Sequence, residues 1–139
     1  MGEIIAFANN HPLLASSVVV FLMAVMAYEL RLKGQGLVQV SSQIAVQLIN
    51  KGATIIDVRP AEAYAGGHIV NAKNMPLATL VGNADPINKK KDKLLLTVCD
   101  TGADARRAAN VLRKVGYGSS FSLKGGLAAW RGDNLPLVK

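Results

Sequence analysis

The only cysteine of the chain, Cys99, stands at the end of an apolar run and directly before a helix-forming stretch. Gly102 follows three residues later, so the chain can turn tightly between the two elements. In such a loop, backbone N–H groups at the start of the helix can face the sulfur and favour the thiolate. A buried structural cysteine at a strand end fits the same pattern. The stretch predicts either a working nucleophile or a structural thiol.

The charged residues near Cys99 in the sequence disfavour the first alternative, a working nucleophile. Asp100 and Asp104 place negative charge near a sulfur that needs positive charge to ionise. Consecutive helical arginines at 106 and 107 point about 100° apart, so they cannot both face the loop. The candidate anion-binding loop consists of Asp100, Thr101, Gly102, Ala103, Asp104 and Ala105, with Arg59 and Arg106 as candidate rim residues.

Short apolar strands alternate with helices around this loop, which indicates an α/β parallel sheet with helices on both faces. Strands are predicted at 53–58, 94–98 and 119–123, and helices at 41–52, 60–67, 77–81, 104–116 and from 125 onward, with a polar loop up to 93. Functional sites of such sheets lie beyond the carboxyl ends of the strands. Asp57, Arg59 and Cys99 fall there.

The N-terminal part has a different composition. Leu13–Leu32 is apolar except near its ends, and twenty helical residues span about 30 Å, the thickness of a bilayer core. A cleavable signal peptide would begin with basic residues, but the only charge before the run is Glu3. A buried helix of a soluble protein is the other alternative. We expect a segment 1–32 with one transmembrane helix at about 12–32, a linker at 33–37, and a domain at 38–139.

The charge distribution predicts the orientation of this helix. All sixteen lysines and arginines lie at position 31 or later, against seven acidic residues, so residues 31–139 carry a net charge of +9. By the positive-inside rule the N-terminus lies outside and the domain lies in the cytoplasm of a bacterial inner membrane. The basic domain should then stay near anionic inner-leaflet lipid. Nucleic-acid binding is disfavoured because the basic run at 89–93 contains no aromatic residue.

Three stretches, in order, resemble the signatures of the rhodanese family and together cover about 38–139. The cysteine loop and its helix resemble the family's active-site loop. The segment 55–77 is similar to its first signature, with Asp57, Arg59, Glu62, Gly67, His68, Ile69, Ala72, Asn74 and Pro76 at the expected places. The segment 123–138 resembles its closing signature, with Gly125, Gly126 and Trp130.

The resemblance implies a sulfurtransferase without cofactor or metal. Cys99 would take sulfane sulfur from a donor such as thiosulfate as a persulfide and pass it to a thiol or cyanide. Active members usually carry arginine or another polar residue where Asp100 and Asp104 stand, and a hydroxyl at the position of Ala105, so turnover should be weak. The rival interpretation is an interaction module that docks to a membrane or a membrane-protein partner. Phosphatase chemistry is excluded because Ala105 replaces the arginine that it requires.

Other positions of these signatures have structural interpretations. We expect Asp57 and Arg59 to form ion pairs and hydrogen bonds that hold the loops. His68 has no second histidine or cysteine nearby in sequence for a metal, so a structural hydrogen bond is favoured. Trp130 is expected in the core, and Glu62 at a helix start.

Overall fold

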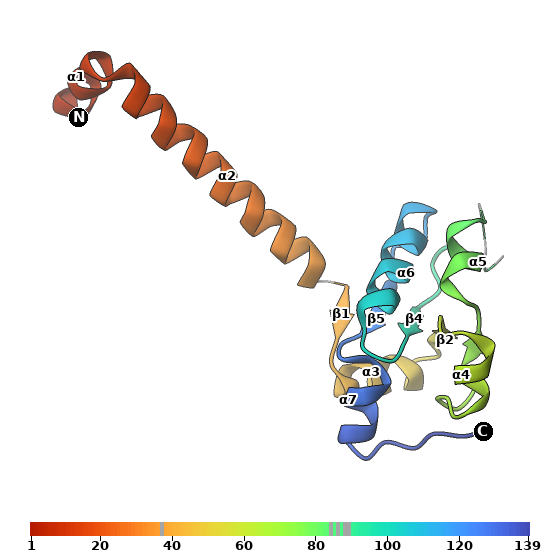
Figure 1. The fold of residues 1–139 in the computed structure, drawn as a ribbon. Coiled ribbons are helices and arrows are strands. Elements are labelled where there is room, and N and C mark those ends of the chain that lie inside the picture. Colours follow the sequence, from red (N-terminus) through yellow and green to blue (C-terminus); the bar gives the residue numbers. More distant parts are fainter. Residues whose placement is uncertain (37, 84, 86, 88–89) are drawn as a thin grey trace. The chain divides into compact units, whose positions relative to one another are not determined.

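The chain forms two separate units (Figure 1), residues 1–36 and 37–139. The computed structural model describes all residues except 37, 84, 86, 88 and 89. In the first unit, α1 (Gly2–Asn10) precedes α2 (Pro12–Gly36), and Pro12 occupies the first turn of α2, where its missing N–H costs no hydrogen bond. Within α2, Pro12–Arg31 is long and apolar enough to cross a membrane by length and composition, and none of it is buried. The helix includes residues 33–36, which we expected to be a flexible link.

The second unit is built on five parallel strands in the order β1-β5-β4-β2-β3. These strands are β1 (Gln39–Val40), β2 (Thr54–Asp57), β3 (Lys73–Asn74), β4 (Leu95–Val98) and β5 (Ser120–Leu123). The buried strands are Val-, Ile- and Leu-rich because helices cover both faces of the sheet. The strand that precedes Cys99, β4, lies at the centre of the sheet and is fully buried.

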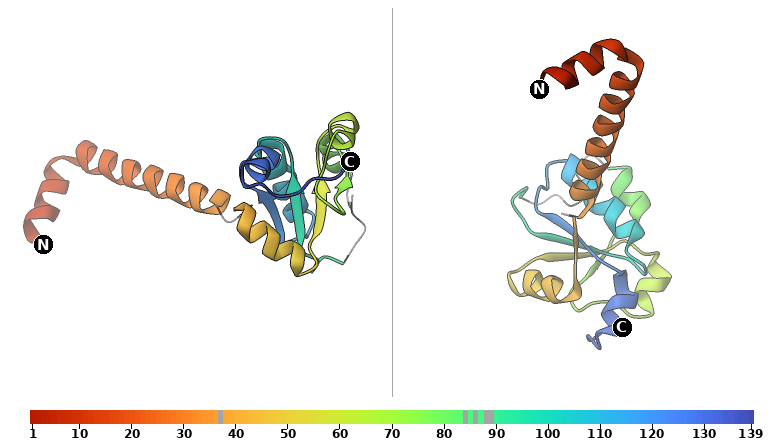
Figure 2. Two further views of the ribbon diagram at one scale, coloured as in Figure 1. Left: turned by 90° about the horizontal axis from the view of Figure 1, so that it is seen from below. Right: turned by 90° about the vertical axis from the view of Figure 1, so that its left-hand side faces the viewer.

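Helices cover the sheet in two layers (Figures 1 and 2). One face packs against α3 (Ser42–Asn50) and α7 (Gly126–Gly132), and the other against α5 (Leu77–Val81) and α6 (Ala103–Lys114). A short helix, α4 (Ala61–Ala65), lies between β2 and β3 in the chain. Alternate residues of a strand point to opposite faces. Leu96 and Val98 therefore join the α3/α7 core, whereas Leu95 and Cys99 join the α5/α6 core.

The α/β sheet with helices on both faces is as predicted, and the three apolar strands lie within one residue of the expected bounds. The expected helices are likewise present, and Ser41 caps α3 by accepting a hydrogen bond from the Ile44 N–H. Two elements were not predicted, β1 and β3, which are edge strands of two residues each. Part of the expected polar loop before β4, and residue 37 of the expected linker, lie outside the described residues.

Candidate functional site

Cys99 lies at the carboxyl end of the central strand and is nearly buried, with 4% of its surface exposed. Three residues separate it from α6, and Gly102 adopts a left-handed backbone conformation, φ 97°, immediately before that helix. A Cβ on Gly102 would lie 3.1 Å from the Gly125 nitrogen, so both the backbone angle and the space require glycine. The loop therefore folds as the sequence predicts, from a strand through a tight turn into a helix.

The loop directs one backbone donor at the sulfur. The Gly102 N–H donates a hydrogen bond to Cys99 Sγ over 2.9 Å, and among the described residues it is the only such donor. The sequence led us to expect several N–H groups there. The first N–H groups of α6, from Ala103 to Ala105, have no acceptor within the helix, because the chain turns at Gly102. These N–H groups directly follow the turn at Gly102 that donates to the sulfur, and they form the positive end of the helix dipole.

The closing segment of the chain supports the cysteine loop from behind. The Leu127 N–H donates to the Cys99 carbonyl over 2.8 Å, and the Ala128 N–H donates to the Asp100 carbonyl over 3.1 Å. Gly126 allows this approach, since a Cβ there would overlap the Cys99 carbonyl oxygen and lie 2.6 Å from the Asp100 carbonyl carbon. Gly125 and Gly126, in the segment that resembles the closing signature, thus let the chain come close enough to hold the backbone of the cysteine loop.

A buried ion network links the first signature to the same loop. Arg59 binds Asp57 through two guanidinium nitrogens, Nε to Oδ1 at 3.0 Å and Nη2 to Oδ2 at 2.8 Å. Nη2 also donates to the Gly67 carbonyl over 2.7 Å, and Nη1 lies 3.3 Å from Asp100 Oδ1. The hydrogen bond to Asp57 raises the pKa of Arg59, despite the opposing effect of its burial. Arg59 is consequently buried, and it forms the ion pair and hydrogen bonds that we expected from the sequence.

The same contact changes the charge balance near the sulfur. The Asp100 carboxylate is 63% exposed, but it shares the Arg59 guanidinium with Asp57. One cation therefore faces two carboxylates, and the group keeps one net negative charge. The sequence alone did not predict an ion-pair partner for Asp100.

The remaining loop residues divide into exposed and buried ones. Asp104 is 57% exposed, with its Oδ1 3.8 Å from Nη1 of Arg107, which is too long for a hydrogen bond. Arg106 is half-buried, and its N–H donates to the Gly102 carbonyl. Thr101 and Ala103 are exposed, and Ala105 is fully buried. The loop thus presents two carboxylates and one threonine hydroxyl to solvent beside a shielded sulfur.

Thr97 is a positioning residue that the sequence analysis missed. Its hydroxyl is fully buried on the α6 face of β4, and Oγ1 lies 2.7 Å from the Ala105 carbonyl oxygen. This hydrogen bond ties the first turn of α6 to the strand that carries Cys99. A hydroxyl within the otherwise apolar stretch 94–98 was the available signal.

His68 and Trp130 have the structural roles expected from the sequence. His68 Nδ1 lies 3.0 Å from the Tyr64 carbonyl oxygen, and its ring stacks on that of Tyr64 with a centroid distance of 3.8 Å. Within the described part of the chain, no three His, Cys, Asp or Glu side chains gather as metal ligands.

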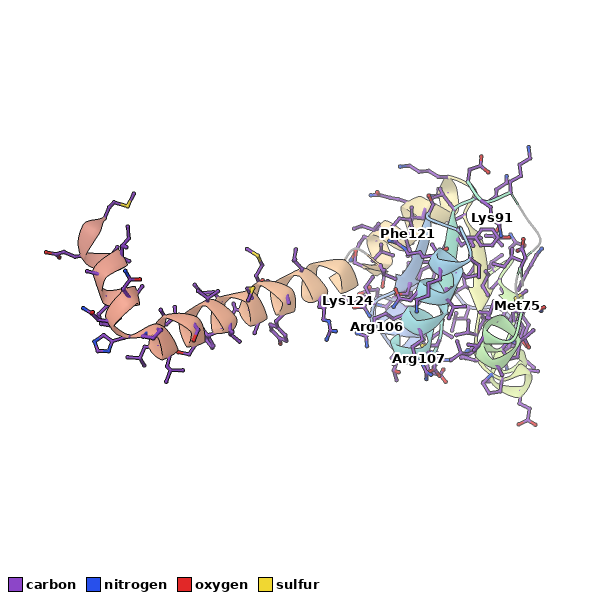
Figure 3. All side chains as sticks on the ribbon, turned by 90° about the horizontal axis from the view of Figure 1, so that it is seen from above. Met75, Lys91, Arg106, Arg107, Phe121 and Lys124 are labelled. Atoms are coloured by element: carbon purple, nitrogen blue, oxygen red, sulfur yellow. The ribbon has the colours of Figure 1, made fainter. Side chains whose placement is uncertain are left out.

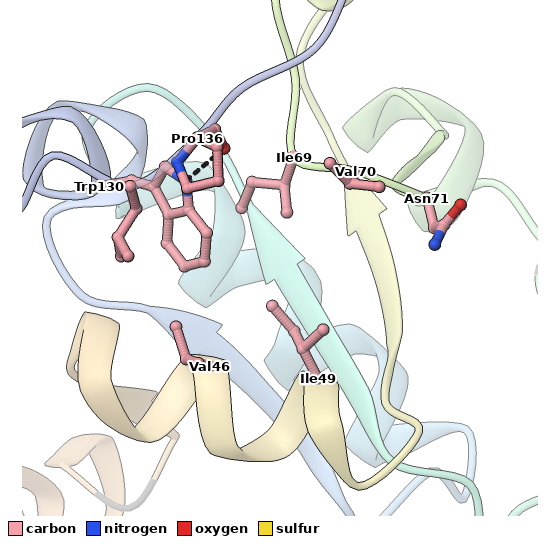
Figure 4. Close-up of a pocket in the computed structure, with 8 residues that line it drawn as sticks. Val46, Ile49, Ile69, Val70, Asn71, Trp130 and Pro136 are labelled. Atoms are coloured by element: carbon pink, nitrogen blue, oxygen red, sulfur yellow. Dashed lines mark hydrogen bonds between the residues drawn. The ribbon is translucent and has the colours of Figure 1, made fainter.

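An apolar hollow of about 260 Å³ lies on the α3/α7 side of the sheet (Figure 4). Trp130 lines it together with Val46 and Ile49 of α3, and the indole N–H donates to the Pro136 carbonyl over 3.0 Å. Ile69, Val70, Asn71, Leu135 and Pro136 complete the lining. Cys99 belongs to the core on the other face, so this hollow contains no group of the candidate site.

The chain is similar in sequence and fold to known proteins. Residues 41–133 match the family described as rhodanese-like domain. The chain is 33% identical to the uncharacterized protein YibN of Escherichia coli strain K12, over all of this chain and 99% of that protein. It is 34% identical to the thiosulfate sulfurtransferase GlpE of Pseudomonas entomophila, over 67% of this chain and 84% of that protein. The rhodanese-like domain of the Alr3790 protein from Anabaena superposes with a TM-score of 0.64 and 31% identity, over 73% of this chain and 78% of that one.

Proposed function

Since the chain belongs to the rhodanese-like domain family, we propose that it is a sulfurtransferase that carries sulfane sulfur on Cys99. The observation that supports this most directly is the 2.9 Å hydrogen bond from the Gly102 N–H to Cys99 Sγ, at the start of α6. A backbone donor and the positive end of a helix dipole lie beside the sulfur, where the reaction places negative charge.

The proposed reaction has two displacement steps. The Cys99 thiolate attacks the outer sulfur of thiosulfate, a sulfur–sulfur bond forms to Cys99, and sulfite leaves with the electron pair of the bond that breaks. Cyanide or a thiolate then attacks the outer sulfur of the persulfide, which releases thiocyanate or a new persulfide and regenerates the Cys99 thiolate. No external oxidant or reductant is consumed. The first N–H groups of α6 have no acceptor within the helix, so they can donate to the anionic outer sulfur.

We further propose that turnover with thiosulfate is weak. The Asp57–Arg59–Asp100 group retains one negative charge, and Asp104 adds a second carboxylate with only a distant arginine. Both carboxylates repel a dianionic donor such as thiosulfate. Ala105 offers no hydroxyl to compensate. The alternative function is an interaction module of low or no activity that docks to a membrane or protein partner.

Mass spectrometry separates the two functions. The full chain is treated with thiosulfate, and the peptide that contains Cys99 is weighed before and after addition of cyanide. A carrier gains the mass of one sulfur atom, which cyanide removes, and Cys99→Ser gains none. Asp100→Asn with Asp104→Asn should raise the rate of loading. If neither the wild type nor this double variant gains sulfur while both remain folded, the interaction module is the better description.

We also propose that α2 anchors the chain in a bacterial inner membrane, with its N-terminus outside and the rhodanese-like domain in the cytoplasm. The support is the apolar stretch Pro12–Arg31 and the basic residues that follow it. A C-terminal reporter that is active only outside the cytoplasm should give no signal, and a cytoplasmic reporter at the same place should give one. The reverse pattern contradicts the orientation.

A further inference from the structure

Three lysines lie near the amino ends of β2 and β4, whereas the candidate site lies at the carboxyl ends of these strands. Lys51, Lys90 and Lys93 line a hollow of about 300 Å³ together with Gly52, Asp92 and Leu94. All three lysines are exposed. Asp92 is the only acidic residue in the lining, so the hollow is basic.

The fold itself brings these lysines together. Lys51 ends α3, and Gly52 then turns the chain through a left-handed conformation, φ 90°, toward β2. Lys90 and Lys93 belong to a turn before β4, in which the Lys93 N–H donates to the Lys90 carbonyl over 3.1 Å. The two connections meet because β2 and β4 are paired, and the Thr54 N–H donates to the Leu94 carbonyl over 2.9 Å. Positions about forty residues apart in sequence thus form one surface.

These cations are available to an external anion. Lys51, Lys90 and Lys93 have no ion-pair partner among the residues that the structure describes. Their neighbour Lys91 differs, because its Nζ lies 2.8 Å from Asp85 Oδ2, and this hydrogen bond raises the pKa of Lys91. The three lysines therefore remain hydrated charges without an internal role.

The lysines are well separated from the cysteine. From Leu95 to Cys99 the central strand rises about 13 Å at 3.3 Å per residue. Figure 3 shows Lys91, the neighbour of this cluster, at the end of the domain opposite Arg106 and Arg107. A surface bound through the lysines leaves the mouth of the cysteine loop open.

We propose that Lys51, Lys90 and Lys93 form a docking surface for anionic phospholipid headgroups of the membrane in which the chain is anchored. The inference rests on the proposed anchor but not on sulfur transfer. Only six residues, seven steps along the chain, separate Arg31, the end of the apolar stretch, from Val38, which begins the described part of the domain. Even fully extended, they span about 25 Å. A tether this short holds a basic surface at high effective concentration beside headgroup phosphates.

The test uses the full chain in vesicles of neutral lipid and in vesicles that also contain phosphatidylglycerol. Exposed lysines are acetylated with a reagent that does not cross the bilayer, so only outward-facing domains react, and mass spectrometry measures each position. We expect Lys51, Lys90 and Lys93 to be protected in the anionic vesicles alone and to react again at high salt. Lys73, which pairs with Ile56 near the carboxyl end of β2, and Lys124, which directly follows β5, should react equally in both vesicles.

A matched pair of variants gives a second measurement. Energy transfer from Trp130, the only tryptophan, to a dansyl-labelled lipid reports how close the domain lies to the bilayer. Substituting Lys51, Lys90 and Lys93 by Gln should lower the ratio of docked to undocked domain about fivefold per lysine, or roughly a hundredfold in total. The control, Lys73, Lys124 and Lys139 to Gln, removes the same charge and should leave the transfer unchanged.

Each failure has a distinct meaning. Flotation of the vesicles on a density gradient shows whether the chain is bound to them. If the chain does not float with either kind of vesicle, the anchor is absent and the inference fails with it. If the chain floats with both but the three lysines react equally in both, the docking surface is wrong while the anchor stands. If inorganic phosphate at matched ionic strength protects the lysines without anionic lipid, the surface binds a soluble anion and the lipid assignment is wrong. The persulfide assay is independent of all three outcomes.

Discussion

Replacement of Gly126 by alanine tests whether the closing segment holds the cysteine loop. Gly126 has φ 59°, in the left-handed region, which costs a residue with a side chain about 1–2 kcal/mol. The new Cβ would overlap the Cys99 carbonyl oxygen and come within 2.6 Å of the Asp100 carbonyl carbon. Because these are backbone atoms, the loop itself must move.

The magnitude follows from the contacts that this movement breaks. Two hydrogen bonds to the loop, from the Leu127 and Ala128 N–H groups, contribute about 1 kcal/mol each. Together with the backbone conformation, the loss in free energy of unfolding is about 3–4 kcal/mol, a large part of the 5–15 kcal/mol typical of a domain. Loading of Cys99 by thiosulfate should fall as well, since the sulfur and its Gly102 donor are displaced.

The assay is urea unfolding of the full chain in a neutral detergent, followed by the fluorescence of Trp130, which is buried against the core. Gly132→Ala is the matched control, because it lies in the same helix with no atom near the position of its Cβ. Alanine there should leave stability unchanged or raise it by up to about 1 kcal/mol. If Gly126→Ala unfolds at the same urea concentration as Gly132→Ala, the close approach of α7 to the loop is not what holds Cys99.

Three further substitutions probe the supports of the site. Arg59→Leu leaves the buried Asp57 carboxylate unpaired and should lower the free energy of unfolding by about 3–5 kcal/mol, as measured by urea unfolding. If this loss is smaller than the loss caused by replacing an exposed arginine, Arg59 has no structural role. Thr97→Val keeps the shape but leaves the Ala105 carbonyl without its hydroxyl donor, so stability should fall by about 1–3 kcal/mol and persulfide loading should slow; unchanged loading would show that this bond does not position α6. Tyr117→Phe removes the 2.6 Å hydrogen bond to Asp85 and should lower the thermal midpoint by a few degrees while loading stays unchanged, because Tyr117 follows the C-terminal end of α6, whereas the cysteine loop precedes its N-terminal end.

Secondary structure and the general position of the site were predictable from the sequence. Apolar runs such as Leu94–Val98 are long enough to mark buried strands, and the serine and glycine residues at helix ends mark their limits. The place of Cys99 between a strand and a helix follows from these patterns alone, because the carboxyl ends of parallel strands are where loops open into helices. The edge strands β1 and β3 were missed because two residues paired through their backbone leave no side-chain pattern.

The balance of charge near the sulfur depends on contacts between segments that are distant in the chain. Asp57 and Arg59 are two residues apart, but Asp100 comes from a different strand end, and the parallel pairing of β2 with β4 brings its carboxylate to Arg59. The sequence carries the charges but not these distances, and an electrostatic energy depends on distance and burial. The same reason applies to Gly126, whose need for glycine comes from the Cys99 and Asp100 carbonyls, about twenty-five residues away in the chain. Local patterns specify the elements, whereas long-range contacts specify what surrounds the sulfur.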